Sequence, residues 1–184
     1  FDDTADLIAP YKPHLACVLL LDISGAMDKN PLKVVNDFKY QIQEIQRKDV
    51  FGIESAQIDI AIIVFNNSCV QVVQDFISLS DFQRTEIMLT VSGVSSDIAI
   101  NAGINFAIDK VKERNMLYSD MGTPCFKPWI FMITDGAATD DLSTARQRII
   151  NEDVNKNKLK FWALGVPGFN PTQLTSLTER CIAL

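Results

Sequence analysis

The chain has 184 residues, of which 47% are hydrophobic and 22% are charged, and its formal net charge at pH 7 is -6. This composition indicates a globular domain and excludes a disordered chain. Lys and Arg never cluster beyond a pair, which argues against a nucleic-acid partner because binding to a phosphate backbone needs a basic stripe. The longest apolar run, at residues 15–21, is too short to span a bilayer, so we expect no membrane partner.

The cysteines and the start of the chain bear on the cellular compartment. Cys17, Cys69, Cys125 and Cys181 are scattered without a C-x-x-C pair, and a chain of this length needs no disulfide. We expect Cys17 and Cys69 to be buried thiols in apolar strands, with a disulfide between any pair as the alternative. No basic segment followed by an apolar stretch opens the chain, so we expect a cytoplasmic protein.

In chain order, the first half of the sequence predicts strands that alternate with a helix. The apolar run at residues 15–21 predicts a strand buried on both faces. Pro31 then opens an amphipathic helix that ends near residues 48–49. Residues 58–65 predict a second buried strand. A turn and the partly alternating segment 69–76 complete a hairpin, so one strand runs antiparallel to the others.

The second half continues the alternation. Apolar residues at helical spacing predict a helix over residues 98–114, and a buried strand follows at residues 129–133. We expect the pattern-poor segment 118–128 between them to be a surface loop, with a place beside the binding surface as the alternative. The remaining predicted elements are a helix at residues 141–154, a strand at 159–166, a helix at 172–177 and a strand at 181–184.

This alternation predicts an α/β fold, in which a doubly wound, mostly parallel sheet has one antiparallel edge strand and helices on both faces. Such sheets bind ligands at the carboxyl ends of their strands. Two of the predicted strands end in the same way, in a hydrophobic run followed by an acidic residue, Asp22 or Asp135. We therefore expect Asp22 and Asp135 to lie side by side at one rim of the sheet.

Two aspartates at neighbouring strand ends, with the Ser24 hydroxyl two residues after the first, predict an oxygen-rich cation site. Mg²⁺ prefers octahedral oxygen ligands, keeps several waters and is held by one or two carboxylates, and Mn²⁺ favours the same donors. A single aspartate at a strand end more often caps a helix or forms a turn. The pair in matching contexts favours the metal site.

The two strand ends also carry a resemblance to a known family. The sequence VLLLDISGAM at residues 18–27 resembles the D-x-S-x-S opening of von Willebrand factor A (vWA) domains, and IFMITDG at residues 130–136 is similar to the later T-D-G strand end of that family. The segments KPW and ATDD, at residues 127–129 and 138–141, resemble the stand-alone bacterial domains associated with tellurite resistance, called TerY-like. The resemblance implies one vWA-like domain over residues 1–184, truncated at its C-terminal end relative to the family.

The resemblance also implies a set of metal ligands. The family's site uses the Asp and both hydroxyls of D-x-S-x-S, a Thr from a loop between the two strands, and the later Asp. Asp22, Ser24 and Asp135 match three of these positions. Ala26 stands where the second Ser is expected and has no oxygen to offer.

The loop threonine has no clear counterpart. Aligning the apolar face of the helix at residues 98–114 with the family pattern places Ile98 at the Thr position. A shift by two residues would substitute Ser96 but spoils the register of the apolar face. The neighbouring Asp97 is the carboxylate that we expect in its place.

With the second Ser absent and the Thr replaced, the resemblance implies a degenerate metal-ion-dependent adhesion site (MIDAS). We expect it to hold Mg²⁺ or Mn²⁺ more weakly than an intact site, or to bind its partner without an ion. In the family, an acidic side chain of a protein partner completes the coordination shell. The resemblance therefore implies a protein-interaction or adaptor module and not an enzyme. In TerY-like systems it would work beside a kinase and a phosphatase in a bacterial tellurite or stress response.

An enzyme that uses the acidic rim is the alternative. Asp22 with Mg²⁺ would then be the nucleophile of a phosphoacceptor or phosphohydrolase. The D-I-S sequence, however, lacks the second carboxylate of the D-x-D phosphatase pattern, and no glycine-rich nucleotide loop is present. The only histidine, His14, precedes the first predicted strand, and we expect it at the surface or in a cap. Trp129 and Trp162 lie inside apolar strand patterns and are expected in the core.

Overall fold

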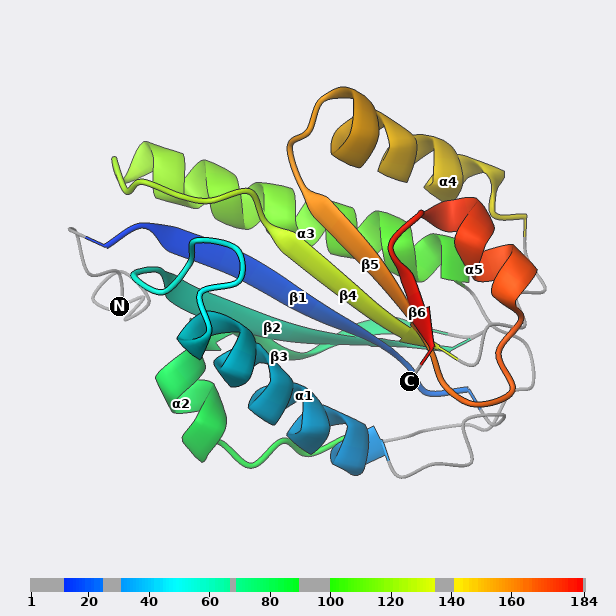
Figure 1. The fold of residues 1–184 in the computed structure, drawn as a ribbon, viewed down its shortest axis with the longest axis horizontal. Helices are drawn as coiled ribbons and strands as arrows, with labels where there is room; N and C mark the ends of the chain where they lie inside the picture. The colour runs from blue at the N-terminus through cyan, green and yellow to red at the C-terminus, as the bar shows by residue number, and fades with distance from the viewer. Residues whose placement is uncertain (1–11, 25–30, 67–68, 90–99, 135–140, 184) are drawn as a thin grey trace.

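The computed structural model describes residues 12–24, 31–66, 69–89, 100–134 and 141–183, which form a sheet with helices on both faces (Figure 1). The strands are β1 (His14–Asp22), β2 (Gln57–Phe65), β3 (Val70–Ser78), β4 (Trp129–Thr134), β5 (Lys160–Gly165) and β6 (Cys181–Ala183). The helices are α1 (Pro31–Arg47), α2 (Leu79–Arg84), α3 (Ile100–Asp120), α4 (Ser143–Ile149) with its π-helical continuation η2 (Ile150–Asn155), and α5 (Pro171–Leu177).

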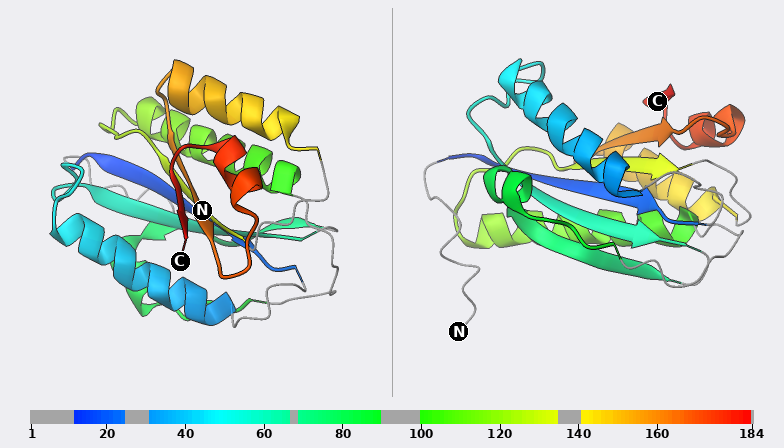
Figure 2. Two further views of the ribbon diagram at one scale, coloured as in Figure 1. Left: turned by 45° about the vertical axis from the view of Figure 1, so that its right-hand side comes forward. Right: turned by 90° about the horizontal axis from the view of Figure 1, so that it is seen from below.

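The strand order is β3-β2-β1-β4-β5-β6. Every neighbouring pair is parallel except β2 and β3, which are antiparallel. Helices α1 and α2 lie on one face of the sheet, and α3, α4 and α5 lie on the other (Figure 2). Their buried side chains form two separate core clusters, one on each face. The predicted α/β fold, with its antiparallel edge strand and helices on both faces, is confirmed.

Strand β1 lies in the middle of the sheet because both of its faces are apolar. All nine of its residues are buried. The side chains that join the core under α1 are those of Leu15, Cys17, Leu19 and Leu21. Val18 and Leu20 point to the opposite face and join the core under α3. A run that is apolar at every position is typical of a parallel strand covered on both sides.

Aromatic rings fill the core between α1 and the middle of the sheet. Trp129 and Trp162 are 3% and 8% exposed, which confirms the prediction that both are core residues. Their ring centroids lie 5.3 Å apart in an edge-on arrangement, and Phe131 stacks on Trp162 at 4.8 Å. Such pairs contribute about 0.5–1.5 kcal/mol beyond the area that they bury.

Helix α3 is longer than the sequence indicated. It continues past Arg114 to Asp120, and Tyr118 lies on its buried face, so the predicted loop at residues 118–128 begins only after the helix. The rest of that segment runs along the amino end of the sheet, where His14 N donates a hydrogen bond to Pro124 O at 2.8 Å. The alternative that this segment flanks the rim is therefore wrong, because the rim lies at the other end of the strands.

His14 is buried, and its prediction as a surface or capping residue is wrong. It is the first residue of β1, and its Nδ1 lies 2.7 Å from Asp59 Oδ2. The Tyr118 hydroxyl and the Arg114 guanidinium donate to the same carboxylate oxygen. Burial and the Asp59 carboxylate both raise the pKa of Tyr118, so its hydroxyl stays protonated. We call these four residues the amino-end cluster.

The helix predicted over residues 141–154 is divided into two kinds of turn. The α-helical turns of α4 are followed by the wider π-helical turn of η2, in which Glu152 and Asp153 are buried. Glu152 accepts a hydrogen bond from Lys112 on α3, and Asp153 pairs with Arg180. Because these adjacent acidic residues both have cationic partners, η2 is tied to α3 and to the residue just before β6.

The four cysteines are free thiols. Cys17 is buried in β1 as predicted, and burial raises the pKa of its thiol. Cys69 precedes β3 and is only half-buried, so its prediction as a buried strand residue is wrong. Within the described ranges, no helix is both long and apolar enough to cross a membrane.

Candidate functional site

The rim, meaning the carboxyl ends of the parallel strands, brings Asp22 and Thr134 together. Asp22 ends β1 and Thr134 ends β4, and the two strands pair in parallel through Leu21 and Ile133. Both side chains are fully buried. The Thr134 hydroxyl donates a hydrogen bond of 2.7 Å to Asp22 Oδ2. Sequence reasoning used Thr134 only as part of the T-D-G motif and missed this contact.

A second bond fixes the other oxygen of Asp22. The backbone N–H of Ser24 donates to Asp22 Oδ1 at 2.8 Å, in the local turn that aspartate side chains favour. The backbone N–H of Ile23 donates to Phe65 O on β2 at 2.9 Å. These bonds hold the residues that follow β1 against both neighbouring strands, so the Asp22 carboxylate has a defined orientation.

The hydroxyl oxygen of Ser24 is a polar atom of the rim that points to a ligand. The residue is 2% exposed, and its hydroxyl oxygen has no hydrogen-bond partner among the described residues. A buried hydroxyl without a partner costs about 1–3 kcal/mol. An orphaned oxygen beside an oriented carboxylate fits the role of a cation ligand, because hard divalent cations take oxygen donors of both kinds.

The other predicted ligands are outside the described residues. This holds for Asp97 and Asp135, and equally for Ala26, Ser96 and Ile98. The structure therefore brings Asp22 and Ser24 together as predicted and leaves the two other carboxylates as predictions. In the part of the chain that the structure describes, no three His, Cys, Asp or Glu side chains are grouped to hold a metal.

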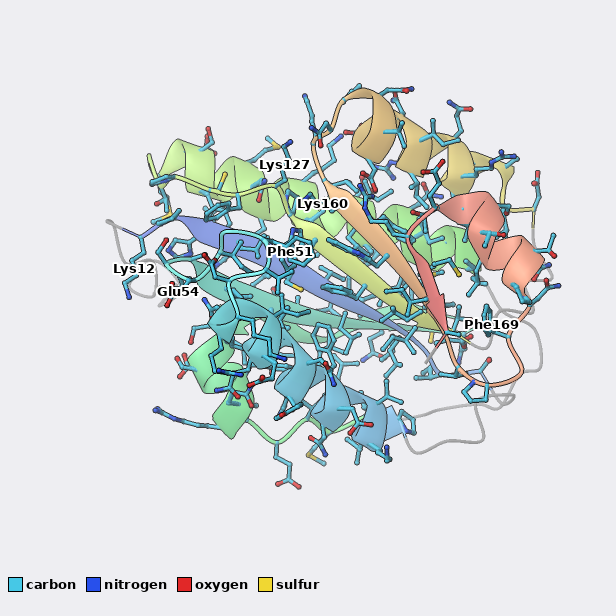
Figure 3. The ribbon with its side chains drawn as sticks, viewed as in Figure 1. Lys12, Phe51, Glu54, Lys127, Lys160 and Phe169 are labelled. Carbon is cyan, nitrogen blue, oxygen red and sulfur yellow. The ribbon has the colours of Figure 1, made fainter. Side chains whose placement is uncertain are left out.

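On the side of β5, the rim is closed by an aromatic ring. Gly165 pairs with Thr134 in the β4–β5 register. A Cβ atom added to Gly165 would lie 2.3 Å from the ring of Phe169, so only glycine permits this approach. Phe169 lies in the loop before α5, at the carboxyl end of the sheet (Figure 3). The candidate site is therefore bounded by packed side chains next to Thr134.

We expect Thr134→Val to lower the free energy of unfolding by about 1.5–3 kcal/mol, since a buried carboxylate loses a hydrogen-bond donor. Urea denaturation followed by circular dichroism measures the effect. Thr134→Ser keeps the hydroxyl and is the control, with the smaller expected loss. Equal stability of the Val and Ser variants would show that the bond to Asp22 contributes nothing.

Known proteins resemble this chain in sequence profile and in fold. The sequence profile of the von Willebrand factor type A domain matches residues 17–180. No curated protein sequence matches the chain. A similar solved structure is that of proximal thread matrix protein 1 (PTMP1) from the mussel byssus, with a TM-score of 0.60 and 15% identity over 94% of this chain and 42% of that chain. This chain thus spans about two fifths of the mussel protein.

Two further structures have the same fold. The mussel protein with a zinc-occupied MIDAS motif has a TM-score of 0.59 and 16% identity, over 94% of this chain and 41% of that chain. The SpRpn10 VWA domain has a TM-score of 0.55 and 12% identity, over 92% of this chain and 86% of that chain. At these identities the similarity shows a shared fold and does not assign the ligands of those proteins to this chain.

Proposed function

Because the chain belongs to the von Willebrand factor type A domain family, whose profile matches residues 17–180, we propose that it is an interaction module that binds a protein partner at the rim. The observation that carries the proposal is the buried, unpartnered Ser24 hydroxyl beside the oriented Asp22 carboxylate. Proteins rarely leave a buried polar atom unsatisfied, and a ligand is one of the reasons for doing so.

In this proposal Asp22 and Ser24 hold a divalent cation, Mg²⁺ or Mn²⁺, with Asp97 and Asp135 as further carboxylates. When bound, the cation supplies a positive charge that an acidic side chain of the partner can meet. The protein's own residues orient the ligands, since Thr134 and the Ser24 N–H fix the two oxygens of Asp22. The zinc-occupied MIDAS motif of the mussel protein supports metal binding on this fold.

The missing hydroxyl at Ala26 gives a sharp test by calorimetric titration with MgCl₂ and MnCl₂. We expect weak binding by the native chain and none by Asp22→Asn. Ala26→Ser should bind roughly tenfold more tightly, because one added oxygen ligand worth ~1.4 kcal/mol changes the affinity by that factor. Ser24→Ala should weaken binding by removing one oxygen ligand, and it should leave the fold unchanged because the Ser24 hydroxyl has no hydrogen-bond partner among the described residues.

The outcomes separate two versions of the proposal. If neither the native chain nor Ala26→Ser releases or absorbs heat, the cation-dependent version is wrong. The ion-free version then requires that the partner bind the rim directly, and Ser24→Ala would be the variant that weakens partner capture. A thermal unfolding transition like that of the native chain confirms that the fold of each variant is intact.

We propose further that the module is an adaptor in the cytoplasm of a bacterium, within a tellurite- or stress-resistance system. The KPW and ATDD segments, which resemble TerY-like domains, support this part. Deleting the gene should lower the tellurite concentration that the cells tolerate, and the native gene should restore it while an Asp22→Asn copy does not. Unchanged tolerance after deletion would contradict the assignment.

We propose that the domain is not an enzyme. Asp22 has no exposed surface, and both of its carboxylate oxygens accept hydrogen bonds, so it is poorly placed to attack phosphorus in line. After incubation with acetyl phosphate and Mg²⁺, mass spectrometry should find Asp22 unmodified. A phosphorylated Asp22 would revive the phosphoacceptor alternative.

A further inference from the structure

A hollow of about 310 Å³ lies at the opposite end of the sheet from the rim. Its walls come from the loop after α1, the segment before β4, and the first residues of β4 and β5. Phe51, Lys127 and Lys160 line it together, and Figure 3 shows them near one another in front of the sheet. Six residues of β4 separate this end from the rim, a distance of about 20 Å.

The aromatic wall is held in place by an ordered loop. Phe51 is 45% exposed, yet its ring meets that of Trp129 edge-on at 5.2 Å between centroids. The loop turns at Asp49, which has a φ of 49°, and at Gly52, which has a φ of 70°. A non-glycine residue in the left-handed region costs about 1–3 kcal/mol and persists only where neighbouring bonds enforce it. Here Asp49 Oδ1 accepts from Glu54 N at 2.8 Å.

The opposite wall is tied to the sheet by backbone bonds. Phe126 N donates to His14 O at 2.8 Å, so this wall is anchored on β1 beside the amino-end cluster. Lys160 N donates to Pro128 O at 2.9 Å. Both lysines of the hollow therefore extend from fixed backbone, and the half-exposed Phe51 ring faces a preformed surface.

The hollow is cationic in a chain whose net charge is negative. None of its lining residues is Asp or Glu. Within the described residues, neither Lys127 nor Lys160 forms an ion pair, and the Lys160 ammonium lies 5.5 Å from the centroid of the Phe51 ring. By contrast, five lysines elsewhere pair with carboxylates: Lys33, Lys48, Lys110, Lys112 and Lys156. Two unpaired ammonium groups beside exposed aromatic surface are suited to an anion with an apolar body.

We propose that this hollow is a second docking site, which binds an acidic segment of a partner protein that carries a bulky apolar side chain. The apolar side chain packs against Phe126 and against Phe51, which lies over the buried Trp129 ring, and the flanking carboxylates lie beside Lys127 and Lys160. Charge complementarity favours this occupant, since the lining holds two lysines and no acidic residue, while the net charge of the chain is -6. The site is independent of the rim, so a partner can engage both ends of the sheet.

The test uses the acetylated, amidated peptide Glu-Phe-Asp-Glu and the intrinsic tryptophan fluorescence of the chain, with EDTA present to keep the rim free of metal. Trp129 lines the hollow and reports occupancy. We expect a saturable change with a Kd on the order of 0.1–1 mM, typical of a short peptide. Lys127→Glu combined with Lys160→Glu should raise the Kd at least tenfold. Added salt should also weaken binding, because it screens exposed charges.

Two controls make the result decisive. Lys158→Glu changes an exposed lysine just before β5 that does not line the hollow, and its Kd should stay within about twofold of the native value. The peptide Glu-Ala-Asp-Glu should bind several-fold more weakly, since it lacks the ring. The proposal is overturned if the native chain shows no saturable change, if the double charge reversal leaves the Kd unchanged, or if the alanine peptide binds equally well.

Discussion

Asp59→Ala is expected to lower the free energy of unfolding by about 3–5 kcal/mol, because it breaks a buried ion pair and leaves an uncompensated charge. Asp59 is 1% exposed and accepts from His14, Arg114 and Tyr118. The Arg114 side chain is itself only 13% exposed. Without Asp59, its guanidinium, the His14 ring and the Tyr118 hydroxyl all lose a buried acceptor.

Urea denaturation monitored by circular dichroism measures this loss, and thermal unfolding should show a Tm lower by roughly 6–20 °C for a domain of this size. Asp75→Ala is the matched control, because Asp75 also pairs with a cation on α3, Lys110, but its side chain is 67% exposed. We expect that control to cost less than about 1 kcal/mol. Similar losses in the two variants would show that the amino-end cluster contributes no more than a surface ion pair.

Phe65→Ala is expected to destabilise the fold by about 3–5 kcal/mol, through the loss of a buried ring and the cavity that it leaves. Phe65 is the last residue of β2, fully buried, and pairs with Asp22 in the β1–β2 register. A Cβ atom added to Gly103 on α3 would lie 3.0 Å from the Phe65 ring. The ring thus packs closely on bare helix backbone and sets the spacing between α3 and β2 near the rim.

Two variants on α3 check this explanation. Phe106→Ala removes a ring that is 39% exposed and should cost clearly less than Phe65→Ala. Gly103→Ala places a methyl group 3.0 Å from the Phe65 ring, so it should be more destabilising in the native chain than when combined with Phe65→Ala, because contacting residues are not additive. Strict additivity in this double-mutant cycle would contradict a direct contact between ring and helix.

The sequence predicted the elements whose patterns are decided locally. β1 and β4 are apolar at nearly every position, and α1 has a regular apolar stripe, so their places in the chain were readable. α2 was missed because it has six residues, too few for a period, and depends on Ser78 as its cap. His14 was misplaced because its partner Asp59 lies 45 positions away, and no local pattern shows that a polar residue beside an apolar run has a buried acceptor.

The part of the site that could be predicted is the part that lies at the end of a recognisable strand. The acid after the first apolar run placed Asp22 at the rim, and the D-x-S spacing placed Ser24 beside it. The bond from Thr134 was missed because it depends on the register between β1 and β4, which the sequence does not state. The T-D-G motif was the available signal, since a threonine just before a strand-end acid neighbours the end of an adjacent parallel strand.

That hydrogen bond joins residues 112 positions apart, and this separation ties the site to the order of folding. β1 can pair with β2 as soon as the first third of the chain is available, but Thr134 arrives only with β4. Parallel pairings between distant segments form slowly, since loop closure must precede them. A chain that has folded only through β3 therefore has Asp22 without its orienting donor. The ability of the rim to bind its ligand should therefore appear late in refolding, when β4 has completed the parallel sheet. Binding at the rim would then indicate a completely folded domain.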